Sequence, residues 1–514
     1  MTKIEYLSLS APKRIAVSFW EWIQRIGLAI ACFFRNLPRK SWKFLKKCAS
    51  PILALCHVFR FGGWRTRVNF LLMGFSQLSH RHFFKGLLYF LYEAVFVAFM
   101  IMTGGPALSM ISTLGTVGGI QGPHAGTGLL VWSYNDNSFE ILLNSIFACF
   151  LILLTLVLWY SSIMDAFQEY SLKLIGKERT DKDFIHDLVG SNYHYMMLGI
   201  PMVLLALFTI IPIIFMVIIG FTNFNSAHYP SQRLFDWVAW NNYAEVFSLG
   251  QDANGMVFLT TFGKVVLWTL VWAFFATFSN YFLGMIFALI INQKGIKLKK
   301  VWRTILITTI AVPQFVSLLI VSQMLNTDSG VFNNILSQLG WIDKNIQWLD
   351  DPLLAKVTII IVNTWVGIPY TMLICTGILM NIPEDLYESA KIDGASPFKM
   401  YMKITLPYML FVTGPYLISQ FVGNINNFNV IYLLTGGNPS FNFVGQNAPG
   451  ILLNSNVGQT DLLITWIYKL TKDSPSQDFG TASVLGVFTF VVVAVISMVF
   501  YNRSSAVKNE EDFQ

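Results

Sequence analysis

Charge is what this sequence has least of. Lys, Arg, Asp and Glu together make up 12% of its 514 residues, whereas hydrophobic residues make up 54%. A soluble globular protein carries about 25% charged residues and about 45–50% apolar ones. Half of the usual charge leaves too little polar surface for a water-soluble fold. Soluble enzymes, nucleic-acid-binding domains and disordered scaffolds are therefore excluded for the chain as a whole, and a membrane protein with several spanning helices remains.

Cysteine and two familiar sequence signals are also scarce or missing. The five cysteines form no CxxC pair and no even framework, so we expect them to be reduced; they are Cys32, Cys48, Cys56, Cys149 and Cys375. No G-x-x-x-x-G-K-[ST] loop occurs, so the chain is not expected to hydrolyse ATP by that mechanism. We expect no signal peptide, because the first long apolar run starts only after some 85 residues and no small-residue cleavage site follows it.

The chain has eight apolar stretches of about 20 residues, the length that crosses a bilayer as a helix. They cover residues 87–103, 141–163, 196–220, 265–291, 304–324, 354–380, 408–434 and 483–501. The first contains Glu93, and the seventh carries four asparagines near its end. The sequence predicts an all-α polytopic membrane protein with about eight transmembrane helices.

Basic residues collect on one side of these helices. If the N-terminus is cytoplasmic, the cytoplasmic segments hold 29 of the 35 Lys and Arg residues. The loop from Thr103 to Glu140 lies on the other side, has neither residue and is rich in Gly. Since cytoplasmic loops carry an excess of Lys and Arg, we expect both termini to be cytoplasmic.

The N-terminal region is strongly basic. Residues 1–86 hold 15 Lys and Arg against two Glu, with an amphipathic stretch at 13–36 and a basic run at 39–47. This pattern favours an interfacial helix that contacts membrane lipid, and not nucleic acid. A charged arm that only secures the orientation is the alternative. The other predicted regions are two additional transmembrane helices with a Gly-rich external loop (87–195), a core of six helices (196–505) and a cytoplasmic tail (506–514).

The cytoplasmic loop at 381–407 is the most informative stretch. Pro383 and the two acidic residues after it suit the start of a helix. Gly394 follows the periodic run, where a left-handed cap would end that helix. Pro397 then suits the start of a second short helix through Lys403, and Pro407 is expected to break the chain before the next span. The loop thus predicts a helix, a Gly turn and a second helix.

The spacing in this loop resembles the EAA signature of ABC importer permeases, which is Glu-Ala-Ala, three residues, Gly, nine residues and Ile-x-Leu-Pro. Six of the seven fixed positions match, and Ser389 stands where the signature has its middle Ala. An ordinary helical hairpin between two spans is the alternative. The residues that the resemblance assigns to coupling with an ATPase are Glu388, Ser389, Ala390, Gly394, Ile404, Leu406 and Pro407.

The resemblance implies a non-catalytic subunit of a larger assembly. The expected partners are a second permease subunit, two copies of a cytoplasmic ABC ATPase and an extracellular sugar-binding lipoprotein. ATP and Mg would be used by the ATPase, so no cofactor is expected on this chain. Alternating access would carry the substrate to the cytoplasm.

Four further stretches resemble the MalF-type permease of maltose/maltodextrin transporters, and the likeness covers roughly residues 196–505. The stretches are 361–370, 424–438, 460–469 and 477–484. The resemblance implies a sugar site made of Asn363, Gly367, Tyr370, Asn424 and Asn427. Amides in spanning helices mostly face the bundle or a wet cavity, and an amide offers both donor and acceptor to a sugar hydroxyl. The alternative is that these asparagines only bond neighbouring helices.

Two departures from the MalF type are visible. Gly423 stands where the maltose-specific pattern has an aromatic residue, so the sugar or its length could differ. The segment Phe221–Gly263 is only about 40 residues long, too short for the large domain found there in the enterobacterial form. A multi-pass protein of a bacterial plasma membrane, of Gram-positive type with a tethered lipoprotein, is the simplest interpretation.

The sequence supports other functional interpretations less well. A permease for another oligosaccharide, of the raffinose or multiple-sugar type, is the first alternative. An ion-coupled secondary transporter would need charges at the midplane, where Glu93 is the one strong candidate. A membrane enzyme would need a paired acid or His, but Asp350-Asp351 suits a helix start. His80 and His82 fit no metal spacing, so we expect no metal site.

Overall fold

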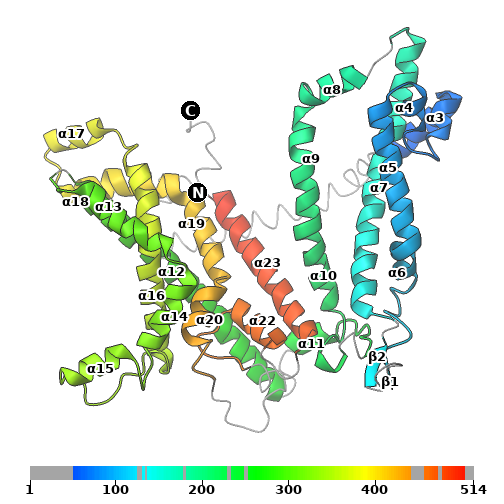
Figure 1. Cartoon of the computed structure of the whole chain (residues 1–514). Coiled ribbons are helices and arrows are strands. Elements are labelled where there is room, and N and C mark those ends of the chain that lie inside the picture. Colours follow the sequence, from blue (N-terminus) through cyan, green and yellow to red (C-terminus); the bar gives the residue numbers. More distant parts are fainter. Residues whose placement is uncertain are drawn as a thin grey trace, which may run out of the picture. The chain divides into compact units, whose positions relative to one another are not determined.

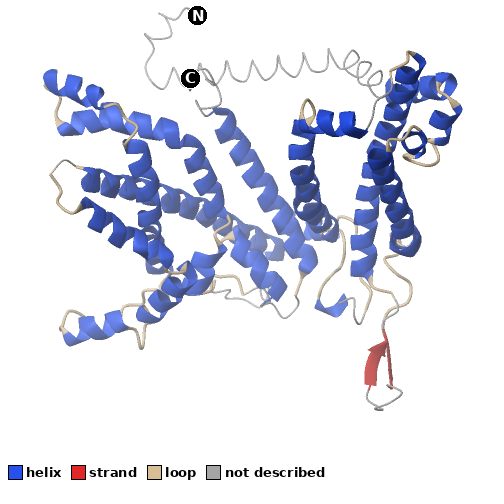
Figure 2. Cartoon of the chain, turned by 45° about the horizontal axis from the view of Figure 1, so that its top comes forward, coloured by secondary structure: helices blue, strands red, loops and turns tan. Residues whose placement is uncertain are grey.

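The computed structural model describes residues 50–123, 130–133, 136–177, 181–228, 233–247, 253–293, 295–441, 456–472 and 477–503. The predicted amphipathic stretch 13–36 and the basic run 39–47 lie outside these residues. Helices dominate the described chain, and Figure 2 shows one small two-stranded hairpin beside them. The hairpin joins β1 (Ile120–Pro123) to β2 (Leu130–Ser133), with Ile120 opposite Ser133.

The chain forms two compact units, which Figure 1 colours along the sequence. The first unit holds Met1–Ser109 and Asn144–Leu207, and the second holds Met110–Leu143 and Phe208–Gln514. The helices that contribute to the first unit are Ser50–Phe61, α3 (Trp64–Val68), α4 (Phe75–Ser79), α5 (Phe83–Phe99), the π turn η1 (Met100–Gly104), α6 (Gly105–Ser109), α7 (Ser138–Leu174), α8 (Asp181–Val189) and α9 (Tyr193–Leu205).

The remaining elements belong mainly to the second unit. They are η2 (Ala206–Ile210), α10 (Ile211–Ile219), η3 (Ser226–His228), α11 (Asn241–Phe247), α12 (Ala253–Asn292), α13 (Lys299–Thr308), η4 (Thr309–Ala311), α14 (Gln314–Met324), α15 (Val331–Gln338), α16 (Pro352–Leu379), α17 (Glu384–Ile392), α18 (Pro397–Met400), η5 (Tyr401–Thr405), α19 (Leu406–Ile425), α20 (Phe428–Thr435), α22 (Leu463–Lys472) and α23 (Phe479–Arg503).

Buried polar side chains hold the first unit together. The Asn69 amide donates to the carbonyl (3.1 Å) and the hydroxyl (2.9 Å) of Ser162 on α7, and the Gln77 amide donates to the same carbonyl at 2.9 Å. Trp159 Nε1 donates to the carbonyl of Phe70 at 2.9 Å. A buried polar group needs such partners, so these bonds fix α3 and α4 against α7.

Glu93 has a structural partner in this unit. Its Oε2 accepts the backbone N–H of Met73 at 2.7 Å. The carboxylate therefore fixes the turn that precedes α4, which is a structural role.

The core of the second unit follows α12. Three apolar clusters follow one another along α12. Each contains an almost fully buried residue of this helix: Val265, Trp272 and Met285. Helix α16 makes the most extensive contact with α12, and α19, α20 and α22 pack against this pair of helices. Close packing along one long helix makes α12 the axis on which the other elements of this unit are positioned.

Six helices of the described residues are long and apolar enough to cross a membrane. They are Phe83–Ser109, Ser138–Leu174, Met197–Ile219, Leu259–Asn292, Pro352–Leu379 and Phe479–Asn502, and each matches a predicted span. Asp351 begins the fifth of them as its N-cap, accepting the N–H groups of Leu353 (3.0 Å) and Leu354 (2.8 Å). That confirms the assignment of the Asp350-Asp351 pair to a helix start.

The other two predicted spans are not continuous helices. The stretch 304–324 is bent by 87° between Ala311 and Gln314. Pro313 lies at this break and supplies no N–H, and Val312 before it is extended (φ −78°, ψ 123°). The stretch 408–434 is divided at Asn426, where α19 ends, and Asn427 caps α20. Apolar content alone therefore overstates the number of straight spans.

Candidate functional site

The loop 381–407, which is predicted to be cytoplasmic, folds as the predicted helix and Gly turn. Gly394 has a φ of +71°, the left-handed conformation that favours glycine. The N–H of Gly394 donates to the carbonyl of Lys391 (3.0 Å), and the N–H of Ala395 donates to the carbonyl of Ala390 (2.9 Å). This pair of bonds is a Schellman motif, in which Ala390 is the third residue from the helix end and Gly394 follows the cap. The three-residue interval between the small residue and the Gly is the interval that this motif requires.

The second arm of the loop differs from the prediction. Ser396 caps α18, with its hydroxyl accepting the N–H of Lys399 at 3.3 Å. The helix then continues through the π turn η5 into α19, and Pro407 lies in the first turn of α19 without breaking the chain. The prediction of a break at Pro407 was wrong. A proline has no N–H to donate, but this loss is tolerated in the first turn of α19, and the widened π turn η5 directly precedes that turn.

A hydroxyl contact and apolar packing join this hairpin to the helical core. The Tyr387 and Thr405 hydroxyls lie 2.8 Å apart and connect the two arms. Tyr401 and Leu406 pack against the buried cluster that α12, α16 and α19 share. Burial raises the pKa of the Tyr401 phenol, so this side chain stays neutral. The hairpin is thus rigid and continuous with the helix bundle.

The hairpin presents apolar side chains on its outer surface. Ile392 is 87% exposed and Phe398 is 73% exposed, and Leu386 and Met402 are exposed as well. Glu388 and Ser389 are exposed, whereas Ala390 is half-buried. Ile404 and Leu406 are half-buried and Pro407 is exposed. Large apolar residues grouped on a rigid projection outside the membrane are typical of a protein interaction site.

The five predicted sugar-site residues lie on two contacting helical segments, α16 and the α19–α20 junction. Asn363 is 4% exposed, and its Nδ2 has no hydrogen-bond partner among the described residues. Tyr370, two turns further along α16, is 50% exposed. A buried amide donor without a protein partner is a group that a polar ligand could satisfy, and the accessible phenol lies two turns away on the same helix.

Asn424 and Asn427 already have protein partners. Asn424 Nδ2 donates to the Thr277 hydroxyl on α12 at 3.0 Å, and Asn427 Nδ2 donates to Asn424 Oδ1 at 3.2 Å. Asn427 Oδ1 also accepts the N–H of Val430 at 3.3 Å as the cap of α20. Both side chains therefore have a role in joining helices, the alternative that the sequence left open.

Gly367 serves close helix packing. A Cβ at this position would lie 2.5 Å from the side-chain nitrogen of Asn280 on α12. One turn away, the hydroxyls of Thr364 and Ser279 lie 2.7 Å apart. Polar residues of α12 thus meet two helices: Thr277 contacts α19, whereas Ser279 and Asn280 contact α16. We name these three residues the α12 polar seam. Sequence analysis missed the seam; the signal was three polar residues within four positions of an apolar span.

An apolar cavity of about 410 Å³ lies on the same unit. It is lined by residues of α14, α15, α16 and the segment before α16, among them the aromatic side chains of Phe332, Trp348 and Trp365. Aromatic faces stack on apolar faces of sugar rings as well as on other rings. Gly423 lies in open space, since a Cβ there would meet nothing within 4 Å.

Among the described residues, no group of three or more His, Cys, Asp or Glu side chains could hold a metal ion. His80 and His82 belong to the first unit, where His82 Nδ1 lies 3.7 Å from a carboxylate oxygen of Asp181. Of the five cysteines, Cys56, Cys149 and Cys375 are free thiols in the described part of the chain.

Comparison with known proteins identifies a family. Residues 280–506 match the family described as "Binding-protein-dependent transport system inner membrane component". The chain is 32% identical to the galactooligosaccharides transport system permease protein GanP of Bacillus subtilis strain 168, over 86% of this chain and 97% of that protein. It is also 32% identical to the maltodextrin transport system permease protein MdxF of the same organism, over 86% of this chain and 95% of that protein. Among solved structures, it is similar to a chain of a bacterial alginate ABC transporter in complex with an alginate pentasaccharide-bound periplasmic protein (TM-score 0.48, 21% identity, 64% of this chain and 98% of that chain).

Proposed function

The chain belongs to the inner membrane components of binding-protein-dependent transport systems, and from this premise we propose that it carries maltodextrin-type oligosaccharides into the cytoplasm. As a permease of this family it is a multi-pass protein of the bacterial plasma membrane and has no catalytic role of its own. ATP hydrolysis and capture of the external substrate belong to an ATPase and a binding protein. The paired permease, the two ATPase copies and a lipid-anchored binding protein are parts of the proposal.

The observation that carries the coupling role is the capped hairpin of α17 and α18. Its Schellman turn accounts for the Gly after the helix cap, and its exposed apolar residues offer a surface to a cytoplasmic partner. Tyr401 and Leu406 connect it to the cluster around α12. Movement of a docked ATPase would therefore move α16 and α19 together with the hairpin.

The α12 polar seam and the residues around it support the proposed sugar site. Asn363 contributes an unpaired buried amide donor, and Tyr370 an accessible phenol. We assign Asn424 and Asn427 a double role: they join α12, α19 and α20, and they keep polar groups beside the transport path. Gly367 allows α12 and α16 to approach closely enough to form the seam. The site would be completed by the second permease as the two subunits alternate between outward and inward access.

Galactooligosaccharide is the second candidate substrate, because the likeness to GanP has the same identity and coverage as the likeness to MdxF. Both sugars present hydroxyls to amides and ring faces to aromatic side chains, so family membership does not separate them. The open space at Gly423 suits either a longer chain or a differently linked one.

Uptake by a strain that lacks this gene tests the proposal. Labelled maltotriose, a labelled β-galactotriose, raffinose and a monosaccharide are each supplied to the deletion strain. The strain is complemented with wild type, with Asn363→Ala, or with the double variant Glu388→Ala/Gly394→Pro. We expect only wild type to restore maltotriose uptake fully, because one variant loses a sugar donor and the other loses coupling.

Each outcome has a definite meaning. Loss of galactotriose uptake with intact maltotriose uptake would replace the proposed sugar by the second candidate. Full uptake with Asn363→Ala would remove that residue from the sugar site. Full uptake with Glu388→Ala/Gly394→Pro would contradict the coupling role of the hairpin. If no sugar is affected by the deletion, the proposed substrate class is wrong.

A further inference from the structure

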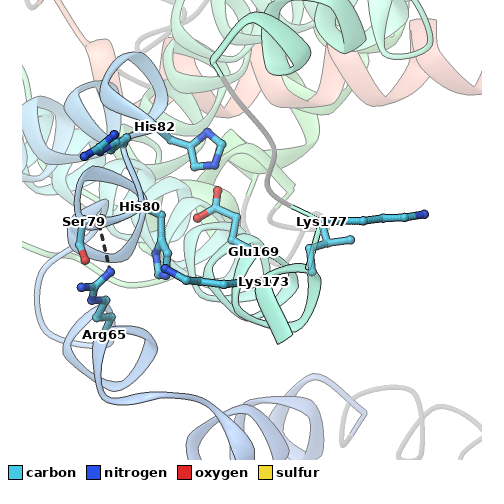
Figure 3. A pocket seen from close by; sticks show the side chains of 9 residues that line it. Arg65, Ser79, His80, His82, Glu169, Lys173 and Lys177 are labelled. Carbon is cyan, nitrogen blue, oxygen red and sulfur yellow. Dashed lines mark hydrogen bonds between the residues drawn. The ribbon is translucent and has the colours of Figure 1, made fainter. Parts of the chain in front are cut away.

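A polar cavity in the first unit has no part in the proposed transport mechanism. It has a volume of about 400 Å³ and lies between the segment Arg65–His82 and the last turns of α7. Four of its lining side chains are cationic and one is a carboxylate: Arg65, Arg81, Lys173 and Lys177 against Glu169. Figure 3 shows Arg65, His80 and Lys173 converging from facing elements, with Glu169 beside them and Lys177 extending outward.

The cavity wall is preorganised by hydrogen bonds. The Arg65 guanidinium donates to the carbonyl of Ser79 at 3.1 Å, which holds it along one wall. His80 Nδ1 donates to the carbonyl of Ser76 at 2.8 Å and so fixes the imidazole ring. The Asn69 and Gln77 amides bond to Ser162 of α7. These bonds attach α3, which carries Arg65, and α4, which ends before His80, to α7. A ligand would therefore meet an Arg65 guanidinium that is already placed, which lowers the entropy lost on binding.

The first amides of α5 are not the source of the anion-binding capacity. Asp181 Oδ2 already accepts the N–H groups of Phe83 (3.0 Å) and Phe84 (3.3 Å). Side-chain cations must therefore supply the attraction. Guanidinium and ammonium groups around a small cavity match the oxygen atoms of a phosphate group.

A neighbouring cavity of about 380 Å³ provides a contrast within the same unit. There the one lysine, Lys85, is paired with Asp165 at 2.7 Å, and Asp187 and Glu169 add two further acids, Glu169 lining both cavities. The lining of this second cavity therefore carries more acidic than basic side chains. The excess of cations is specific to the cavity around Arg65 and Lys173.

The cavity lies at one end of two candidate spans. The candidate span Phe83–Ser109 begins directly after it, and the candidate span Ser138–Leu174 ends in it, so it is at the same end of two spans. This end is the predicted cytoplasmic one. Exposed apolar side chains follow at once along α5, beginning with Phe83, Phe84 and Leu87. Basic pockets between helices on the cytoplasmic side are suited to anionic lipid headgroups.

We propose that this cavity binds an anionic phosphate group, and that its position favours the headgroup of an anionic phospholipid of the cytoplasmic leaflet as the source. The lipid phosphate lies among Arg65, Arg81 and Lys173, while the acyl chains lie against the exposed apolar residues of α5. Free inorganic phosphate has the same chemistry and is the other source. Bound lipid fastens α3 and α4 to the end of α7, independently of which sugar the permease carries.

The test uses the purified full chain. Native mass spectrometry after addition of equal amounts of phosphatidylglycerol and phosphatidylcholine measures which lipid is retained, and the melting temperature in increasing inorganic phosphate at constant ionic strength measures the soluble source. The double variant Arg81→Gln/Lys173→Gln removes two exposed cations of the cavity. Arg60→Gln/Lys182→Gln is the matched control, because it removes one exposed arginine and one exposed lysine of the same unit outside the cavity.

We expect wild type and the control to retain phosphatidylglycerol in preference to phosphatidylcholine, and the Arg81→Gln/Lys173→Gln variant to bind it about tenfold or more weakly. Glu169→Gln removes the one carboxylate and is expected to strengthen retention. Stabilisation by inorganic phosphate without retention of phosphatidylglycerol would support the phosphate site with the soluble source. Equal losses in the double variant and its control, or equal retention of both lipids with no effect of phosphate, would overturn the proposal.

Discussion

Substitution of Gly394 is the sharpest test of the coupling hairpin. At a φ of +71°, an alanine is strained by about 1–2 kcal/mol, because its Cβ approaches the following carbonyl in the left-handed conformation. A Cβ built there meets nothing within 4 Å, so no steric clash is added to this strain. A change of this size lowers the population of the native turn about 5- to 30-fold relative to alternative turns. Gly394→Ala should therefore weaken ATPase docking without preventing insertion.

Two further substitutions at this position extend the expected order of coupling. Asparagine tolerates the left-handed region better than other side chains, so Gly394→Asn should keep most of the coupling. Proline has its φ fixed near −65° and loses the N–H that donates to Lys391, so Gly394→Pro should abolish coupling. The assay is sugar-stimulated ATP hydrolysis by the reconstituted transporter, together with the amount of ATPase that copurifies with the permease.

Gly436 supplies a matched control. It caps α20 with a φ of +58°, and a Cβ there also meets nothing within 4 Å. Gly436→Ala thus introduces the same kind of strain far along the chain from the hairpin. We expect it to lower the melting temperature by a similar amount while ATPase copurification stays normal. Wild-type stimulation of hydrolysis in Gly394→Pro, or equal loss of copurification in Gly436→Ala, would refute the reasoning.

Three more predictions concern the second unit, each measured by the melting temperature of the purified chain unless stated. Gly367→Ala should destabilise by about 1–3 kcal/mol because its Cβ would overlap an asparagine amide of α12, whereas Gly377→Ala on the same helix has open space and should cause no loss. Asp461→Asn should destabilise by about 3–5 kcal/mol because it leaves Lys469, 2.7 Å away and buried, without its counter-charge. Gly423→Trp should insert normally, because a Cβ there meets nothing, and should change the ratio of maltotriose to maltose uptake.

Each of these predictions has an outcome that contradicts it. Equal melting temperatures for Gly367→Ala and Gly377→Ala would mean that the α12–α16 contact is looser than the structure has it. If Asp461→Leu/Lys469→Met is no more stable than Asp461→Asn, unpaired charge is not the cause of the loss. An unchanged uptake ratio in Gly423→Trp would place this residue away from the sugar path.

The parts of the fold that local chemistry determines were predictable. Six spans are continuous apolar helices, and Asp351 and Gly394 occupy the helix ends that their residue types favour. The bend at Pro313 and the uninterrupted helix through Pro407 were not predicted. A proline breaks a helix or begins one according to the turn before it, and that turn depends on packing with distant elements.

The packing of the candidate sugar-site residues was predictable only in part. Isolated asparagines in an apolar span are conspicuous, but their partners on another helix are not. The pairing of Asn424 with Thr277 joins residues 147 positions apart, and the approach of Gly367 to Asn280 depends on the crossing of two helices. A hydropathy average hides Thr277, Ser279 and Asn280, because large apolar residues flank them in the sequence. Only the packed structure shows which neighbouring helix each of these polar residues contacts.

The 87° bend between α13 and α14 has a consequence for how this subunit meets its bilayer. The 11 residues of α14 rise only about 16 Å, roughly half of the hydrocarbon thickness that a full crossing requires. Where α14 is upright, α13 lies almost parallel to the membrane plane, with Lys299, Lys300 and Arg303 suited to the lipid phosphates. Within a bilayer, an apolar helix this short would create a hydrophobic mismatch, which the bilayer relieves by thinning and a neighbouring protein relieves by covering the helix. A second permease beside α14 would remove the elastic strain of the bilayer, and that strain would favour the assembled pair over the separate subunits.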